Sequence, residues 1–124
     1  MTQTTLFVCV LCRFSASESK AVPQPGQTLF DELRKAIEHS DAINLQSVRC
    51  MGACQSACVA AFAAPNKLTF VLSNLSPTES VSDLLQFGRQ HASCTDGKVP
   101  YKERPETIKQ KIHAVLPLLP NNNP

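Results

Sequence analysis

Residues 6–11 form an unbroken apolar run, Leu-Phe-Val-Cys-Val-Leu, with threonines before it and Arg13 shortly after it. A short, continuously apolar run with β-branched and aromatic side chains is typical of a strand that is buried on both faces of a sheet. This run therefore predicts a central strand around which the rest of the chain has to fold.

The segments that follow predict a strand–helix–strand unit. A polar, proline-bearing loop occupies residues 14–26, and a helix is expected to open at Thr28. One face of that helix is apolar: Leu29, Leu33, Ala36 and Ile37. Residues 43–48 have the pattern of a second strand. Strand, helix and strand in this order predict a right-handed crossover and a parallel strand pair.

The next segment predicts an antiparallel hairpin. Two apolar stretches, residues 58–63 and 68–72, are separated by the turn residues Ala-Pro-Asn-Lys at positions 64–67. A helix is then expected to start at Ser76, with Pro77 in the first helical position and Glu79 completing a capping box. Its apolar stripe comprises Val81, Leu84, Leu85 and Gly88.

A last helix is expected after Pro105, with Ile108, Ile112 and Val115 on one face.

The fold class is therefore α/β, with the order βαβ-ββα-α and a four-stranded mixed sheet with helices packed on it, which is the thioredoxin-like layout. A chain of 124 residues suits one domain. We expect that domain to span residues 1–120 and to be followed by a disordered tail, residues 121–124.

Composition narrows the functional classes. Hydrophobic residues make up 43% of the chain and charged residues 18%, with a net charge of +2, which is typical of a globular protein. No basic stripe interleaved with aromatic residues is present, so no nucleic-acid partner is expected. Residues 1–12 lack the features of a signal peptide or a membrane span. We therefore expect no membrane contact and a cytoplasmic location, where cysteines act as ligands or redox groups.

The cysteines form two groups with the spacing of metal ligands. Cys9 and Cys12 make a C-x2-C pair, Cys50 and Cys54 make a C-x3-C pair, and Cys58 follows at the same spacing. In the expected fold both groups follow the carboxyl ends of adjacent parallel strands, where α/β proteins place their sites. Four thiolates on two neighbouring loops can close a tetrahedral site or a small cluster.

Neighbouring residues fit such a site. Gly52 would let the backbone pass close to a metal or sulfide. Arg13 and Arg49 each adjoin a cysteine and would favour thiolates, although both are also explained as solvated loop charges.

A competing interpretation is that several cysteines are simply buried core residues, above all Cys9, inside the first strand, and Cys58, at the start of the third. By strand alternation Cys9 shares a face with Phe7 and Leu11, so it can be a ligand only at the very end of its strand. Cys94 is isolated and is interpreted as incidental. The three histidines are expected to be solvated: His39, His91 and His113.

The run Leu6-Phe7-Val8-Cys9-Val10 resembles the first strand of the thioredoxin-like ferredoxins. Cys50 to Cys54, followed by a valine-containing hairpin and Pro65, is similar to a later segment of the same family. The resemblance implies a [2Fe–2S] cluster with Cys9, Cys50 and Cys54 as ligands. In that family the fourth cluster ligand lies in a loop after the first strand. The corresponding loop of this chain has no cysteine, and Cys12 is the substitute.

The whole chain also resembles a bacterial family of predicted metal-binding proteins of unknown function (DUF1636-like). The family pattern of C-x2-C-R, C-x3-C-x3-C and late Asp-Gly and Arg-Pro pairs is matched along the chain. The matching residues are Cys9, Cys12 and Arg13; Cys50, Cys54 and Cys58; Asp96 and Gly97; Arg104 and Pro105.

Three functions follow as hypotheses. The first is a [2Fe–2S] ferredoxin-like electron carrier, which is not an enzyme and works with a redox partner. The second is a Zn²⁺-binding structural or metal-handling protein. The third is a thioredoxin-type thiol oxidoreductase using Cys9 and Cys12, which is disfavoured because the expected helix begins far beyond that pair. The oligomeric state stays open, a homodimer included.

Overall fold

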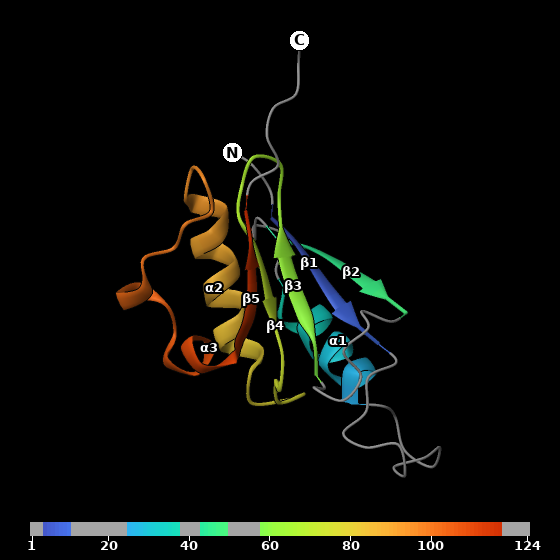
Figure 1. The fold of residues 1–124 in the computed structure, drawn as a ribbon. Coiled ribbons are helices and arrows are strands. Elements are labelled where there is room, and N and C mark those ends of the chain that lie inside the picture. Colours follow the sequence, from blue (N-terminus) through green and yellow to red (C-terminus); the bar gives the residue numbers. More distant parts are fainter. Residues whose placement is uncertain (1–3, 11–24, 38–42, 50–57, 118–124) are drawn as a thin grey trace.

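The computed structural model describes residues 4–10, 25–37, 43–49 and 58–117. A five-stranded sheet with the order β2-β1-β3-β4-β5 forms the centre of the molecule (Figure 1). The elements in chain order are β1 (Thr4–Cys9), α1 (Pro25–Ala36), β2 (Ile43–Val48), β3 (Ala60–Ala63), β4 (Thr69–Leu72), α2 (Val81–Ser93), the 3₁₀ turn η2 (Tyr101–Glu103), α3 (Glu106–Lys111) and β5 (Ile112–Leu116).

β1 and its two neighbouring strands have the predicted arrangement. β1 pairs in parallel with β2, from Thr4 opposite Ile43 to Cys9 opposite Val48. On its other side β1 pairs antiparallel with β3, and β3 forms the predicted hairpin with β4. The predicted bounds of the second strand, residues 43–48, are those observed. β1 lies between two strands and runs from Thr4 to Cys9, but Thr5 and Phe7 are half-buried, so the prediction of a strand buried on both faces was only partly correct.

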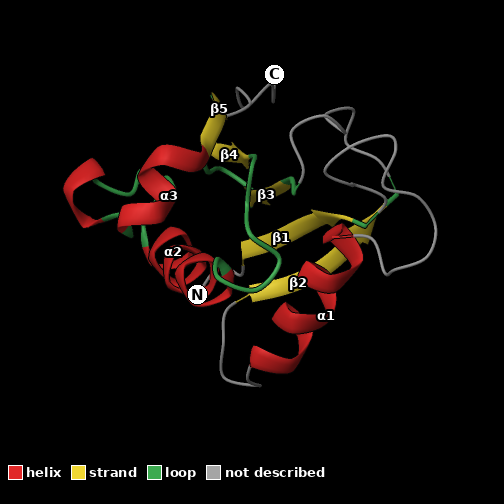
Figure 2. Cartoon of the chain, turned by 90° about the horizontal axis from the view of Figure 1, so that it is seen from below, coloured by secondary structure: helices red, strands yellow, loops and turns green. Residues whose placement is uncertain are grey.

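α1 and α2 lie beside each other against one face of the sheet (Figure 2). The core fills the space between these helices and the strands. Leu6 and Val8 of β1 belong to this core, and they alternate along the strand with the half-buried Thr5 and Phe7. Among the described helices, none has the length and apolar character needed to cross a membrane.

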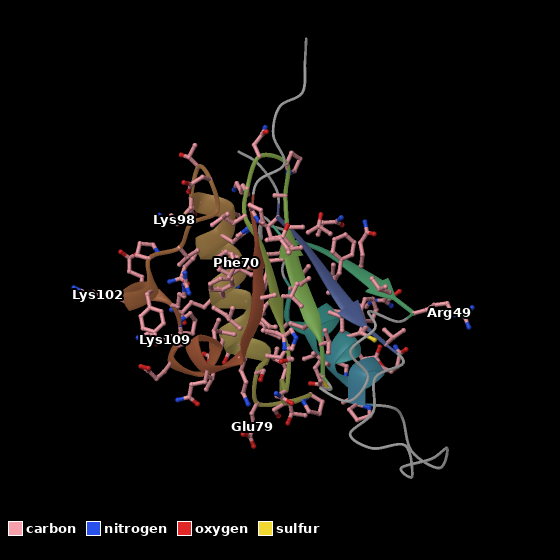
Figure 3. All side chains as sticks on the ribbon, in the orientation of Figure 1. Arg49, Phe70, Glu79, Lys98, Lys102 and Lys109 are labelled. Carbon is pink, nitrogen blue, oxygen red and sulfur yellow. The ribbon has the colours of Figure 1, made fainter. Side chains whose placement is uncertain are left out.

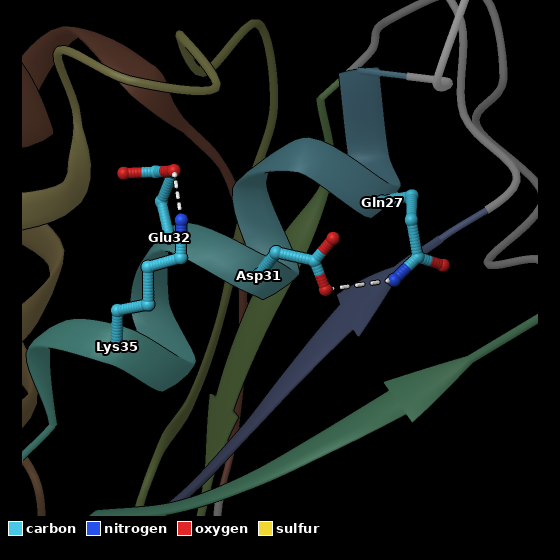
Figure 4. Close-up of polar contacts among 4 residues, drawn as sticks. All are labelled: Gln27, Asp31, Glu32 and Lys35. Atoms are coloured by element: carbon cyan, nitrogen blue, oxygen red, sulfur yellow. Dashed lines mark hydrogen bonds and ion pairs between the residues drawn. The ribbon is translucent and has the colours of Figure 1, made fainter.

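α1 begins at Pro25, earlier than the predicted start at Thr28. Proline suits the first position of a helix because its fixed φ angle is already helical and its missing N–H is not needed there. The outer side of the helix carries local polar contacts (Figure 4): Gln27 Nε2 donates to Asp31 Oδ1 at 3.0 Å, and Lys35 Nζ lies 3.4 Å from Glu32 Oε2.

α2 begins at Val81, later than the predicted start at Ser76. The Ser76 hydroxyl does accept hydrogen bonds from the backbone N–H groups of Thr78 and Glu79, at 3.3 and 2.9 Å. These contacts close a turn that precedes the helix, and Ser80 occupies the N-cap position instead. The capping signal therefore marked the correct region, but the regular helix starts one turn later.

The prediction of a long C-terminal helix and a four-stranded sheet was wrong. α3 does follow Pro105, but it ends at Lys111, and Ile112 to Leu116 form a fifth strand antiparallel to β4. Ile112 and Val115 are β-branched and therefore well suited to a strand. β5 forms backbone hydrogen bonds with the edge of β4. If residues 112–116 continued the helix instead, the backbone groups on that edge of β4 would have no strand to pair with.

Candidate metal centre

Cys9 is the last residue of β1 and is fully buried. Its backbone N–H donates to the carbonyl oxygen of Val59 at 3.1 Å, and its Sγ donates weakly to the carbonyl oxygen of Arg49 at 3.9 Å. The end of the strand is the one position at which the sequence allowed Cys9 to act as a ligand. The structure therefore meets the condition that strand alternation set for this residue.

Cys58 lies just before β3 and is also fully buried. It exchanges backbone hydrogen bonds with Leu75, at 3.3 and 3.1 Å. Burial raises the pKa of the Cys58 thiol to about 11, and the nearby Cys9 contributes to the rise. Because the charge of Cys9 acts on Cys58, the two thiols lie in one region of the molecule, here called the cysteine corner. The sequence predicted this position for Cys58, at the start of the third strand.

The first turn of α1 contacts this corner. A Cβ atom added at Gly26 would lie 2.0 Å from the carbonyl oxygen of Cys9 and 3.2 Å from the Cα of Val10. Only a residue without a side chain permits so close an approach. Sequence reasoning missed Gly26, although a glycine directly after the helix-opening Pro25 was the available signal. The helix start that seemed remote in sequence is adjacent to Cys9 in space.

The carboxyl ends of β1 and β2 leave the sheet together. The backbone N–H of Val10 donates to the carbonyl oxygen of Val48 at 2.9 Å. Arg49, the last described residue after β2, is exposed at this edge (Figure 3). Cys12, Cys50 and Cys54, together with Arg13 and Gly52, lie outside the described residues. The convergence of all four predicted ligands thus stays a prediction.

The remaining candidates lie elsewhere. Cys94 is the C-cap residue that follows α2, where its N–H donates to the Gln90 carbonyl oxygen at 3.1 Å, and it is half-buried. His113 is exposed, as expected, with its Nδ1 3.4 Å from Ser73 Oγ. His39 lies outside the described residues. Within the described ranges, no group of three or more histidine, cysteine or acidic side chains is placed to hold a metal.

The prediction that His91 is solvated was wrong, because this side chain is fully buried. Its Nδ1 accepts from the Thr4 hydroxyl at 2.8 Å, and its Nε2 donates to the Leu68 carbonyl oxygen at 2.7 Å. Burial lowers the pKa of His91, the hydrogen bond to Leu68 opposes this effect, and the charge of Lys67 adds to it. The neutral ring is thus a satisfied core residue.

Comparison with solved structures defines the class of fold. A thioredoxin-like [2Fe–2S] ferredoxin from Aquifex aeolicus matches with a TM-score of 0.61 and 16% identity, over 93% of this chain and 94% of the ferredoxin. A second structure of that wild-type ferredoxin matches with a TM-score of 0.60 and 15% identity, over 92% and 99% of the two chains. The protein therefore has the thioredoxin-like fold that the sequence predicted.

The sequence also defines the family. Residues 6–118 match the family described as "Protein of unknown function (DUF1636)", and the chain belongs to this family. No curated protein matches the chain. The predicted whole-chain resemblance to this family is confirmed.

Proposed function

We propose that this protein binds a [2Fe–2S] cluster through cysteine thiolates and serves as a small ferredoxin-like electron carrier. The observation that carries the proposal is the corner at the carboxyl end of β1, which holds two buried thiols, those of Cys9 and Cys58. Thiolate ligands select thiophilic metals and iron–sulfur clusters. The likeness of the fold to thioredoxin-like [2Fe–2S] ferredoxins supports a cluster over a single metal ion.

The proposed ligands are Cys9, Cys12, Cys50 and Cys54. Two of the similar structures are variants of the Aquifex ferredoxin in which single cysteines, four positions apart, are replaced by serine. Cys50 and Cys54 have the same spacing. Cys58 would then be a fifth sulfur beside the site, available to the metal only if Cys9 is not.

The residues of this chain would prepare the site in three ways. Burial of Cys9 keeps water away from its sulfur, and a dry site influences the reduction potential of a cluster. Gly26 brings the amino-terminal end of α1, with its partial positive charge, against the backbone of Cys9. The bound cluster would supply one-electron transfer to a redox partner, in the reducing cytoplasm where thiols persist.

Anaerobic purification tests this proposal. We expect a coloured protein with iron and acid-labile sulfide in equal amounts, and an electron paramagnetic resonance signal after reduction by dithionite. A colourless protein with stoichiometric zinc would contradict the cluster and support the zinc-binding alternative instead. A protein without bound metal after anaerobic purification and reconstitution would contradict both.

A thiol oxidoreductase is a second candidate, favoured by the contact between Gly26 and Cys9. Catalytic cysteine pairs lie at helix amino termini, where the dipole favours the thiolate. The metal-free protein would then reduce insulin disulfides with dithiothreitol as electron donor, and the Cys9→Ser and Cys12→Ser variants would not. An inactive metal-free protein would eliminate this candidate.

A further inference from the structure

The positive charge of the chain is concentrated in one segment. Residues 98–111 contain five of the twelve lysines and arginines but only two of the ten acidic residues, which gives this segment a net charge of +3. The whole chain has a net charge of +2, so all other residues together contribute −1. Such an uneven distribution attracts a partner of opposite charge to one part of the surface.

An exposed aromatic ring lies within this segment. Tyr101 is 61% exposed, although most large hydrophobic side chains in the described part of the chain are buried. The guanidinium carbon of Arg104 lies 5.6 Å from the centre of the tyrosine ring, and Lys109 Nζ lies 5.0 Å from it. Two cations therefore hold the ring in place while leaving it accessible.

The segment is also fixed to the body of the protein. Arg104 Nε donates to the Val99 carbonyl oxygen at 3.0 Å, and its guanidinium lies 5.2 Å from the centre of the buried Phe70 ring. Gln90 of α2 donates to the Glu103 carbonyl oxygen. A surface that is already ordered loses less entropy when it binds, so these contacts favour docking.

This surface is remote from the cysteine corner. Lys98, Lys102 and Lys109 lie on the α2–α3 side of the molecule, whereas Arg49 marks the opposite side, at the end of β2 (Figure 3). A protein bound to the first side would leave the end of β1 accessible. The surface thus offers a function separate from metal binding.

We propose that Lys98, Tyr101, Lys102, Arg104 and Lys109, here called the Tyr101 surface, dock an acidic segment of a partner protein. Exposed Lys98 and Lys102 would meet carboxylates, and the tyrosine ring would pack against an apolar side chain of the partner. Tyrosine and arginine are the residue types enriched where binding energy concentrates. This proposal goes beyond electron transfer and does not depend on the metal.

The chemistry favours an acidic protein over a nucleic acid. Glu103 and Glu106 lie among the cations, and Glu106 Oε1 is 3.5 Å from Lys109 Nζ. A nucleic-acid backbone carries closely spaced phosphates that would repel these carboxylates. A protein segment can place its carboxylates opposite the lysines alone.

Binding of a fluorescein-labelled acidic peptide, an oligo-glutamate with one central leucine, tests the proposal by fluorescence anisotropy on the full chain. The Lys98→Glu/Lys102→Glu double variant should bind at least about tenfold more weakly. Tyr101→Ala should bind about fivefold more weakly, while Tyr101→Phe keeps wild-type affinity because the ring remains. The Arg34→Glu/Lys35→Glu variant on α1 makes the same charge change elsewhere and should bind within about twofold of wild type.

Three results would overturn the proposal. The first is equal weakening in the α1 control, because binding would then reflect net charge alone. The second is tighter binding of a short DNA duplex than of the peptide, with the same dependence on Lys98 and Lys102. Absence of peptide binding at low salt, where surface electrostatics are strongest, would also contradict it.

Discussion

The two ends of β1 lie in buried corners that are completed in different ways. At the Thr4 end, the ring of His91 has a hydrogen-bond partner for each nitrogen, at 2.8 and 2.7 Å. Lys67 Nζ beside it donates to the carbonyl oxygens of His91 and Ala92 at 2.9 and 2.7 Å. At the Cys9 end, the described sulfur contact is the long one to Arg49, 3.9 Å, and Cys58 is a buried thiol.

The His91 corner has a structural role. Buried polar groups are tolerated when short hydrogen bonds replace those lost to water, and the His91 corner meets this requirement within the chain itself. Lys67 in addition satisfies the last carbonyl groups of α2 and complements the negative end of its dipole. Among the described residues, the one hydrogen bond of the Cys9 sulfur is long, and Cys58 is a buried thiol, so this corner is the place where the proposed metal would bind.

Replacing His91 should have the largest effect on stability. His91→Phe keeps the aromatic volume but leaves the Leu68 carbonyl oxygen and the Thr4 hydroxyl without their partner. Each unsatisfied buried group costs about 1–3 kcal/mol, so we expect a loss of about 4 kcal/mol in the free energy of unfolding, measured by urea denaturation. The exposed His113→Phe variant is the control and should change stability by less than about 0.5 kcal/mol. An equal effect of both variants would contradict the structural role of His91.

Gly26→Ala should come next, with a loss of about 3 kcal/mol, because the new Cβ would lie 2.0 Å from a backbone oxygen that cannot rotate away. The same displacement at the end of β1 should lower the metal content per folded chain. Denaturation and metal analysis measure the two effects. Unchanged stability together with unchanged metal content would show that α1 does not support the cysteine corner.

A fall in pH should lower the stability that the buried His91 gives to the folded protein. Burial lowers the pKa of this histidine, so between its ordinary value of about 6.5 and the lower folded value the unfolded chain binds a proton that the folded chain does not. The stabilisation is complete above about pH 6.5 and decreases as the pH falls, by up to about 1.4 kcal/mol per unit. Urea titrations across this range should show the slope in wild type and its loss in His91→Phe. A slope that is equal in both proteins would refute this assignment.

Removing the Cys58 thiol should have the smallest effect. Cys58→Ala deletes one buried sulfur and should cost about 1 kcal/mol in unfolding free energy. Metal content should stay at the wild-type level if Cys9 is the ligand. Metal loss in this variant would instead identify Cys58 as the fourth sulfur.

The sequence predicted the inner part of the fold well. β2 has its predicted bounds, and the parallel β1–β2 pair and the β3–β4 hairpin were expected from apolar runs separated by turn residues. Cys58 was also expected at the start of the third strand, and it lies just before β3. These features depend on local patterns, which is why one sequence sufficed to find them.

The errors occurred where distant segments decide the outcome. The spacing of Ile108, Ile112 and Val115 fits a helix, and only the open edge of β4 turns the last two into a strand. His91 follows Gly88 at helical spacing and so continues the apolar stripe of α2, a signal that the polar character of histidine obscured. The first turn of α1 reaches Cys9 through the crossover, which sequence distance does not reveal.

Metal analysis of single cysteine variants tests the central claim most directly. Iron and acid-labile sulfide are measured per chain after anaerobic purification of wild type and of serine variants at all six cysteines. We expect the cluster to be lost in Cys9→Ser, Cys12→Ser, Cys50→Ser and Cys54→Ser, and retained in Cys58→Ser and in the Cys94→Ser control. A full complement of iron and sulfide in Cys9→Ser would contradict the account, because the end of β1 would then not hold the metal.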